Sequence, residues 1–259
     1  MSPRTPRTRT RIPITTDPAT AVRASAFADA AAGDSSMQLL RLLHLSSPAL
    51  PIGSFHFSQG LEYAVDAGWV TDEHTACEWI GGIAAGSLAT LDLPVLHRLH
   101  AAWKRDDGAA IREWNAFLIA CRETHELRLE DRHLGGAMLR VLAEFDITTE
   151  LFPVGALNTH GVSHATAFAL ACARWRIDSL AALQAYAWAW TENQVLAAVK
   201  LVPLGQSAGQ RILHALSAQL VVHASNARDV MDSDIGVSTS LSAVASGRHE
   251  TQYTRLFKS

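Results

Sequence analysis

Apolar residues along most of the chain recur at helical spacing. One stripe runs at steps of three and four residues through Ile111, Trp114, Leu118 and Cys121. A second stripe of the same kind covers residues 134–145. Such steps place side chains on one face of an α-helix, where they can meet a core. The same pattern predicts further helices over 92–106, 155–175, 178–201 and 207–225.

The pattern offers no convincing strand. Val, Ile and Thr are scattered, whereas Ala and Leu, which favour helix, dominate the sequence after residue 36. No repeat of fixed length recurs, which argues against a solenoid. The sequence therefore predicts an all-α fold, a single-domain helical bundle of roughly eight to ten helices with no sheet.

Local signals refine these helices. Thr71, followed by Asp72 and Glu73, has the pattern of an N-cap before a negatively charged first turn. Glycine inside a helix costs up to about 1 kcal/mol relative to alanine, so its presence needs a reason. We interpret the helical glycines as close helix–helix contacts, with hinges as the alternative, at Gly81-Gly82, Gly135-Gly136 and Gly161.

The first 36 residues differ from the rest of the chain. They are rich in Pro, Thr and Arg and show no hydrophobic period. Such a segment cannot bury enough apolar surface to offset the entropy lost on ordering. We predict a disordered N-terminal tail over 1–36, an all-α domain over 37–245 and a separate C-terminal tail over 246–259.

Composition and charge exclude some classes of function. The 259 residues carry a formal net charge of −3, with a pI near 6.4. This balance argues against a general binder of nucleic acid or of an anionic membrane. The three cysteines form no CxxC pair, which favours free thiols in a reducing cytoplasm. No uninterrupted apolar run approaches the ~20 residues of a membrane span, so we expect a soluble, cytoplasmic protein.

Two histidine pairs have the spacing of metal ligands. His97 and His100 lie three residues apart, and His160 and His164 lie four apart, so each pair shares a helical face. No HExxH motif accompanies them, and surface or core histidines are the alternative. No nucleophile motif, phosphate-binding loop or dinucleotide fingerprint is present either. We therefore expect no enzyme, and His160 and His164 remain weak metal candidates.

Charged residues of both signs crowd the segment RETHELRLED, residues 122–131. On a helix these side chains are neighbours at three and four residues, which is typical of a solvated, ion-paired face. A carboxylate metal site is the alternative.

A polar and ring-rich segment, SSPALPIGSFHFSQGLE, interrupts the helices at residues 46–62. Its two prolines disfavour helix before them, so the preceding helix should end by Ser47. Gly53 permits a turn, and Ser58 could cap a helix that starts near Gln59. A bare connector does not explain the rings of Phe55, His56 and Phe57.

Four motifs together resemble the urease accessory protein F family, over nearly the whole chain after the first tail. They are SPALPIGSFHFSQGLE at 47–62, RETHELRLE at 122–130, ENQVLAAVKLVPLGQSAGQR at 192–211 and RHETQYTRLFKS at 248–259. The resemblance implies an all-α homodimer that acts as a non-enzymatic scaffold chaperone. With the D/H-type accessory protein it would recruit the G-type GTPase for nickel insertion into apo-urease. Nickel would be handled by the assembled complex, and this chain would need no cofactor of its own. A direct nickel- or zinc-binding metallochaperone using paired histidines is the alternative.

The same resemblance suggests two sets of residues. A partner-binding set comprises Phe55, Ser58, Glu62, Lys200, Arg248, His249, Glu250, Tyr253, Arg255, Leu256 and Phe257. A structural set, for the dimer or a buried network, comprises Asn193, Gln194, Gln206, Gln210 and Arg211. Interface-rich residue types in the C-terminal tail favour docking on a partner, with packing on its own body as the alternative.

Overall fold

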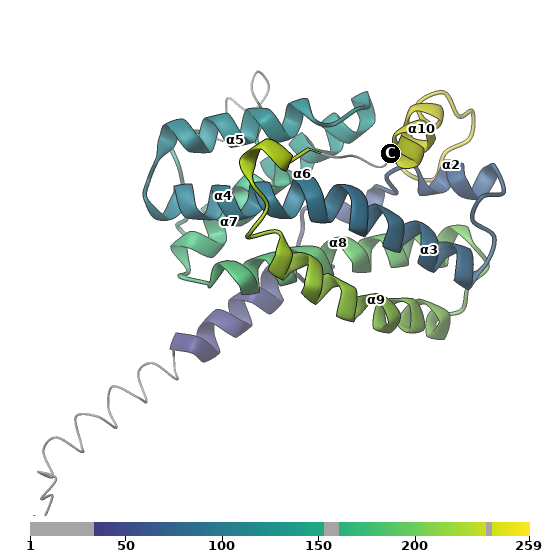
Figure 1. The fold of residues 1–259 in the computed structure, drawn as a ribbon, viewed down its shortest axis with the longest axis horizontal. Coiled ribbons are helices and arrows are strands. Elements are labelled where there is room, and N and C mark those ends of the chain that lie inside the picture. Colours follow the sequence, from purple (N-terminus) through teal and green to yellow (C-terminus); the bar gives the residue numbers. More distant parts are fainter. Residues whose placement is uncertain (1–33, 153–160, 237–239) are drawn as a thin grey trace, which may run out of the picture. The chain divides into compact units, whose positions relative to one another are not determined.

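A computed structural model describes residues 34–152, 161–236 and 240–259 (Figure 1). Contacts divide the chain into two units, Met1–Leu39 and Leu40–Ser259. The described part of the first unit, residues 34–39, is helical. Most of the predicted N-terminal tail therefore lies outside the described residues.

The described part of the second unit is built from helices and the loops between them, without a strand, which confirms the all-α prediction. Residues 40–45 are helical and lead into the first loop. The α-helices are α2 (Leu61–Asp66), α3 (Glu73–Ile83), α4 (Leu93–Lys104), α5 (Gly108–Ala120), α6 (His125–Ala143), α7 (His164–Arg174), α8 (Ser179–Leu201), α9 (Gln206–Asn226) and α10 (Ser240–His249). Shorter elements are η1 (Ser54–His56), the π-helical η2 (Ala84–Asp92) and η4 (Asp232–Asp234).

Helices α3, η2 and α4 form one continuous helical stretch from Glu73 to Lys104. This stretch is long and apolar enough to cross a membrane by length and composition, with a mean hydropathy of 1.4 over its most apolar window. Asp92 lies inside this stretch, so it is not the uninterrupted apolar run that the sequence analysis considered. Its apolar character is explained by packing, since 56% of that window is buried and Leu93 and Leu96 lie fully inside the bundle.

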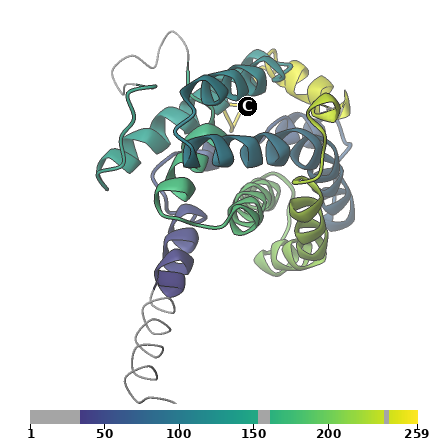
Figure 2. The ribbon, with the colours of Figure 1, turned by 60° about the vertical axis from the view of Figure 1, so that its left-hand side comes forward.

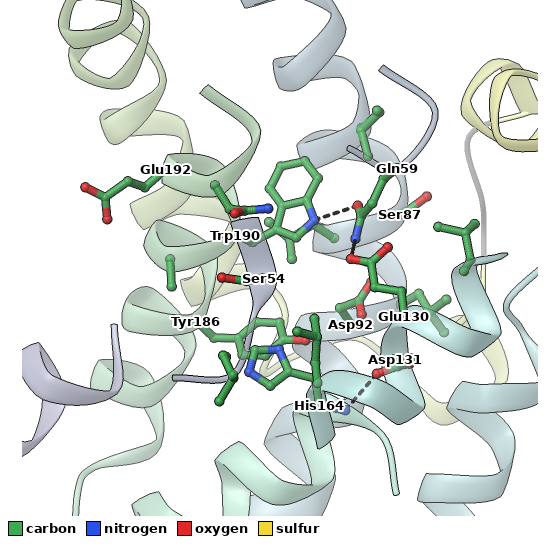
Figure 3. Close-up of a pocket in the computed structure, with 18 of the residues that line it drawn as sticks. Ser54, Gln59, Ser87, Asp92, Glu130, Asp131, His164, Tyr186, Trp190 and Glu192 are labelled. Carbon is green, nitrogen blue, oxygen red and sulfur yellow. Dashed lines mark hydrogen bonds between the residues drawn. The ribbon is translucent and has the colours of Figure 1, made fainter. Parts of the chain in front are cut away.

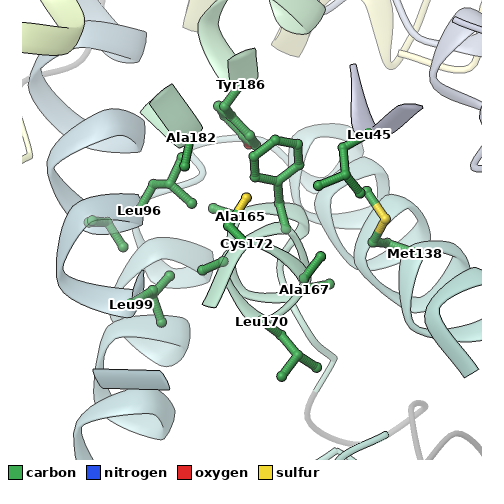
Figure 4. Packing of buried hydrophobic residues seen from close by; sticks show 14 of the residues in the cluster. Leu45, Leu96, Leu99, Met138, Ala165, Ala167, Leu170, Cys172, Ala182 and Tyr186 are labelled. Atoms are coloured by element: carbon green, nitrogen blue, oxygen red, sulfur yellow. The ribbon is translucent and has the colours of Figure 1, made fainter. Parts of the chain in front are cut away.

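Two apolar clusters fill the interior. The first surrounds α7, whose small side chains Ala165 and Ala167 let α4 and α6 pack close to it. Figure 4 shows Leu96 and Leu99 of α4 on one side of this helix and Met138 of α6 on the other. The second cluster joins α2, α3, α8 and α9, which run past one another in Figures 1 and 2.

Helix boundaries follow the predicted ones closely where local sequence decides them. Helices α8 and α9 start and end within one residue of the predicted 178–201 and 207–225. The predicted start of a helix at residue 155 is wrong over its described part. Residues 161–163 are not helical, and the Ser163 hydroxyl caps α7 by accepting from the amide of Thr166.

The N-cap of α3 is Asp72 and not Thr71 as predicted. Its carboxylate accepts from the amide of Thr75 at 2.8 Å, and the Thr75 hydroxyl accepts from the amide of Asp72 at 3.1 Å. This reciprocal capping box satisfies two donors of the first turn, which the sequence pattern around Thr71 did not distinguish.

Gly135 confirms the prediction of close contact between elements. A Cβ atom there would lie 2.1 Å from the carbonyl oxygen of Val162, which belongs to the backbone before α7. Gly82 is different, because a Cβ atom there would meet nothing within 4 Å. Only the first glycine is required by packing.

We expect Gly135→Ala to lower the free energy of unfolding by about 1–3 kcal/mol, the usual cost of overpacking, since a backbone cannot move aside easily. Gly82→Ala is the matched control and should be neutral or stabilising by up to about 1 kcal/mol. Urea unfolding of the two variants measures both values. Equal stability of the two variants would contradict the role assigned to Gly135.

Candidate functional site

The loop of residues 46–60 ends at a tight backbone turn. Gln59 and Gly60 both have positive φ, 54° and 83°, and α2 begins at Leu61. The predicted helix start near Gln59 is therefore wrong, although the Ser58 hydroxyl still accepts from the Glu62 amide at 3.3 Å. A Cβ atom on Gly60 would lie 2.7 Å from the amide nitrogen of Ser246, so this glycine lets α10 pack against the turn.

The two phenylalanines of the loop have opposite environments. Phe57 is buried and lies edge-on to His133 of α6. Phe55 remains 48% exposed, beside the ring of His56. Lys200 of α8 lies over it, with Nζ 5.8 Å from the centre of the Phe55 ring, within the range of a cation–π contact. The loop is therefore anchored by one ring and presents the other.

The C-terminal strap, defined here as residues 250–259, packs on this loop. A backbone oxygen of Ser259 accepts from both the amide and the hydroxyl of Ser58, at 2.7 and 2.5 Å. The amide of Lys258 donates to the carbonyl of His56 at 2.8 Å. Phe257 is buried in the second apolar cluster, and Lys200 also lies over its ring at 5.6 Å.

Three consequences follow for the residues predicted in the tail. The predicted boundary at residue 246 falls inside α10, which continues to His249. In the single chain the tail packs against its own helical bundle, which was the alternative to docking on a partner. This packing leaves Tyr253 fully exposed and Leu256 69% exposed, so contact with a partner through these two side chains stays a prediction.

Glu62 is the main anchor of the strap. Its Oε1 accepts from the amide of Leu256 at 2.6 Å, and its Oε2 accepts from the amide of Phe257 at 2.8 Å. The same Oε2 lies 3.1 Å from Nε2 of His249. Because Glu62 is only 8% exposed, these hydrogen bonds replace those that its carboxylate would make to water.

Glu126 of α6 completes this buried cluster. Its Oε2 lies 2.7 Å from Nδ1 of His249, and its Oε1 accepts from Arg255 at 2.7 Å. His249 is fully buried between two carboxylates. It donates to Glu62 and Glu126 together only when both ring nitrogens carry a proton. In that state two carboxylates face two cationic groups, which is the compensation that buried charges need.

Glu250, the first residue of the strap, caps the N-terminus of α6. Glu250 accepts from the backbone amides of His125 and Glu126, at 2.7 and 3.2 Å. These amides are among the unsatisfied donors of a helix N-terminus, where negative charge is favourable. Arg248, the neighbouring basic residue, is exposed.

The prediction of a solvated face over 122–131 is wrong. Glu126, Glu130 and Asp131 are all buried, because tertiary partners surround them. Arg122 accounts for part of this burial, since its guanidinium pairs with Asp92 and, at 2.9 Å, with Asp131. Burial opposes the charge of Arg122, but the two aspartates outweigh it and raise the pKa of Arg122 well above its ordinary value.

Glu130 faces a small cavity of about 100 Å³, with polar and apolar lining, between the loop, α6 and α8 (Figure 3). Its Oε1 accepts from the amide nitrogen of Gln59 at 2.8 Å, and its Oε2 accepts from the hydroxyl of Ser259 at 2.8 Å. Trp190 in turn donates to the amide oxygen of Gln59 at 2.9 Å. Burial raises the pKa of Glu130 to about 7, against the smaller effect of these hydrogen bonds.

His164 lies on another side of the same cavity (Figure 3). Its backbone amide donates to Asp131 at 2.7 Å, whereas its Nε2 has no partner among the described residues. Burial lowers the pKa of His164 to about 4, so the ring is neutral near pH 7. Its predicted partner, His160, lies outside the described residues.

The other histidine pair is occupied by structural hydrogen bonds. His97 Nδ1 lies 2.7 Å from the hydroxyl of Ser179, and His100 Nε2 lies 2.9 Å from the carbonyl oxygen of Ile177. Over residues 34–152, 161–236 and 240–259, no three His, Cys, Asp or Glu side chains are grouped as a metal ion would require. The described part of the chain therefore gives no ligand set for nickel or zinc.

The predicted structural set is dispersed. Asn193 donates to the carbonyl of Phe57 at 3.2 Å and so ties α8 to the loop. Gln194 is buried without a hydrogen-bond partner among the described residues. Gln206 and Gln210 are exposed on α9, and Arg211 forms an exposed ion pair with Glu73 at 2.5 Å. The structure does not join these five side chains in one network.

Several residues of the site belong to neither the partner-binding set nor the structural set predicted from the sequence. They are Gln59, Asp92, Arg122, Glu126, Glu130, Asp131, Trp190 and Ser259. The spacing of Glu126 and Glu130, four residues apart on α6, was a usable signal, because it places both carboxylates on one helical face. Their partners lie up to 129 residues away, so the spacing alone could not show which side of the helix is buried.

The described residues thus define an all-α helical protein whose C-terminal strap docks on its own bundle through buried carboxylates. Comparison with known proteins identifies the family. The profile of the family described as UreF matches residues 70–217. The urease accessory protein UreF of Alkalilimnicola ehrlichii is 47% identical over 219 residues, which covers 85% of this chain and 95% of the relative.

Two further relatives carry the same name. The urease accessory protein UreF of Azoarcus sp. is 46% identical, over 86% of this chain and 96% of its own length. That of Hahella chejuensis is 41% identical, over 86% of this chain and 99% of its own length. The chain therefore belongs to the UreF family.

We expect Glu62→Gln to loosen the strap, since a neutral amide offers one acceptor oxygen in place of two. The free energy of unfolding should fall by about 1–3 kcal/mol, the usual cost of leaving buried groups unsatisfied. Limited trypsin digestion with mass spectrometry should show faster cleavage after Arg255. Glu78→Gln on α3, where the side chain is 66% exposed, is the matched control, and cleavage as slow as in that control would contradict the anchoring role.

Proposed function

We propose that this protein is a urease accessory protein, a scaffold without catalytic activity that takes part in urease maturation. Its membership of the UreF family and the name shared by its relatives support this role. The structural observation that supports a scaffold role is a set of exposed side chains on a backbone held by hydrogen bonds. We call this set the docking surface and define it as Phe55, Lys200, Tyr253 and Leu256.

The docking surface combines the residue types that interfaces favour with low conformational freedom. Aromatic side chains are enriched at interface cores, and a preorganised backbone lowers the entropy cost of binding. Phe55 is held by the anchored loop, and Tyr253 and Leu256 are held by the strap. Other members of the predicted partner-binding set are buried and hold the docking surface in place without being exposed to a partner. They include Ser58, Glu62, His249 and Phe257.

The partner that we propose for this surface is the D/H-type urease accessory protein. The resulting pair would recruit the G-type GTPase and act on apo-urease in the cytoplasm. Nickel is the cargo of the assembled complex, and the chain itself needs no resident cofactor. This assignment rests on the family resemblance of the loop and strap motifs.

We expect Phe55→Ala and Tyr253→Ala each to weaken capture of the D/H-type protein by at least tenfold, the effect of removing about 1.4 kcal/mol of binding free energy. Phe145→Ala is the matched control, because Phe145 is 41% exposed but contacts His44 and Trp175. Pull-down and titration calorimetry with purified partner measure the effect. Capture unchanged in the two variants, with helicity intact, would refute the docking surface.

We propose further that the protein is a homodimer, and that an apolar groove of about 540 Å³ contributes to the contact between copies. The groove lies between residues 42–48, α8 and α9, and is lined in part by Leu43, Trp188 and Val221. These three side chains are 59%, 38% and 53% exposed in the single chain. Exposed apolar side chains gathered at a groove are typical of a surface that another chain covers.

We expect Val221→Asp to shift the protein to the monomer, because a charge in an apolar interface loses its water without gaining a partner. Sedimentation equilibrium measures the mass directly. Val244→Asp on α10 is the control, since Val244 is 51% exposed but lies outside the groove. A dimer that survives Val221→Asp would place the contact elsewhere.

A further inference from the structure

Glu130 is a buried carboxylate whose hydrogen-bond partners are both neutral. It is 4% exposed, and its two oxygens accept from the amide of Gln59 and the hydroxyl of Ser259. No ion pair with Glu130 occurs among the described side chains. A carboxylate without a cationic partner is costly to bury in its charged form, so it favours the protonated one.

The strap is what closes this site. Ser259 is itself fully buried and supplies the hydroxyl at Oε2 of Glu130. A backbone oxygen of Ser259 accepts from the Ser58 amide, and the Lys258 amide donates to the His56 carbonyl. If the strap left the loop, Oε2 would lose its partner and that side of the carboxyl group would open to water. Docking of the strap therefore completes the burial of Glu130 at its Oε2 side.

We propose that the C-terminal strap is a proton-dependent latch, in which docking of residues 250–259 is accompanied by uptake of a proton at Glu130. The strap then docks more tightly below neutral pH than above it. This inference concerns the isolated chain and needs none of the partners proposed above.

The hydrogen-bond geometry suits the protonated acid. Trp190 donates to the oxygen of Gln59, which turns the amide nitrogen of Gln59 toward Glu130 and fixes Oε1 as an acceptor. At Oε2 the partner is a hydroxyl, which can accept as readily as it donates. Protonated Glu130 can therefore donate to Ser259 while it accepts from Gln59, without any rearrangement.

The direction of the pH effect follows from this burial. Burial raises the pKa of Glu130 to about 7 in the docked state, from an ordinary value of 4.5. The docked state therefore binds more protons than the released state between these two values. Docking weakens as the pH rises through that interval and becomes independent of Glu130 above it. Between pH 6 and pH 8 the docking constant should fall by about tenfold.

The other charges around Glu130 do not reverse this direction. Arg122 is committed to Asp92 and Asp131, whose opposite charges offset its own. On the strap side, Arg255 is paired with Glu126. His249 of α10 contacts Glu62 and Glu126, and neither of its ring nitrogens is bonded to a Glu130 oxygen. Lys200 lies over the ring of Phe257, and the charge of Lys258 acts on His133, whose pKa is lowered by burial and then by this charge. Among the described side chains, neither lysine is paired with Glu130.

Hydrogen exchange of the full-length chain tests the latch. The amides of Leu256, Phe257 and Lys258 report on the strap, because they donate to Glu62 and His56 only when it is docked. Their protection factors, corrected for the intrinsic effect of pH on exchange, should be about tenfold lower at pH 8 than at pH 6. Amides of α4 report on the global fold and should not change by that factor.

Two variants separate Glu130 from other groups. Glu130→Gln imitates the protonated acid, since its amide can donate to Ser259 and accept from Gln59. We expect its strap to be as protected at pH 8 as at pH 6. Glu144→Gln, an exposed glutamate next to the end of the same helix, should keep the pH dependence of the original chain.

Two results overturn the proposal. One is strap protection in the original chain that does not differ between pH 6 and pH 8. The other is a pH dependence that survives in Glu130→Gln, which would assign the switch to another group such as His249. A carboxyl ¹³C titration of the original chain decides the matter even if the variant fails to fold. Glu130 should titrate near 7, and an ordinary titration near 4.5 would remove the latch.

Discussion

The arrangement of the site depends on one carboxylate that holds two successive backbone amides. The carboxylate of Glu62 accepts hydrogen bonds from the amides of both Leu256 and Phe257, and it also faces the buried ring of His249. Every residue except proline carries a backbone amide, so this contact depends less on the side chains of the strap than its other contacts do. The loop, α2, α6 and α10 are brought together around it, and the exposed side chains of loop and strap acquire fixed positions as a result.

The region is rich in buried charge, which has a physical cost. Arg122 pairs with two aspartates, and Glu126 pairs with His249 and Arg255, so most charges are compensated. A buried ion pair adds little to the free energy of unfolding compared with apolar packing, but removing one partner lowers that free energy strongly. Glu130 lacks such a cation, and one of its two hydrogen-bond partners, Ser259, belongs to the strap. Specific docking and sensitivity to protons thus arise from the same group of carboxylates.

The two faces of the loop show how a connector can become a working surface. Phe57 is buried, and Asn193 reaches the Phe57 carbonyl from α8. Phe55, two residues earlier, points outward under Lys200. The buried ring and the tight turn at Gln59 and Gly60 hold the loop, so the exposed ring is presented without a large loss of entropy on binding.

The sequence by itself determined the helices whose limits depend on local chemistry. Helices α8 and α9 were predicted within one residue, because an apolar period, Pro203 and Gly205 mark their ends. The loop at residues 46–60 could also be predicted, because its two prolines disfavour helix before them. The family resemblance could likewise be drawn from the sequence, because its motifs are contiguous.

Only the tertiary structure decided which polar residues are buried. The segment 122–131 has the pattern of a solvated face, yet its carboxylates meet Ser259, His249 and Arg255 from the far end of the chain. Helical spacing shows which side chains share a face, but burial depends on what packs against that face. Those contacts join residues more than 120 positions apart, and no local pattern encodes them.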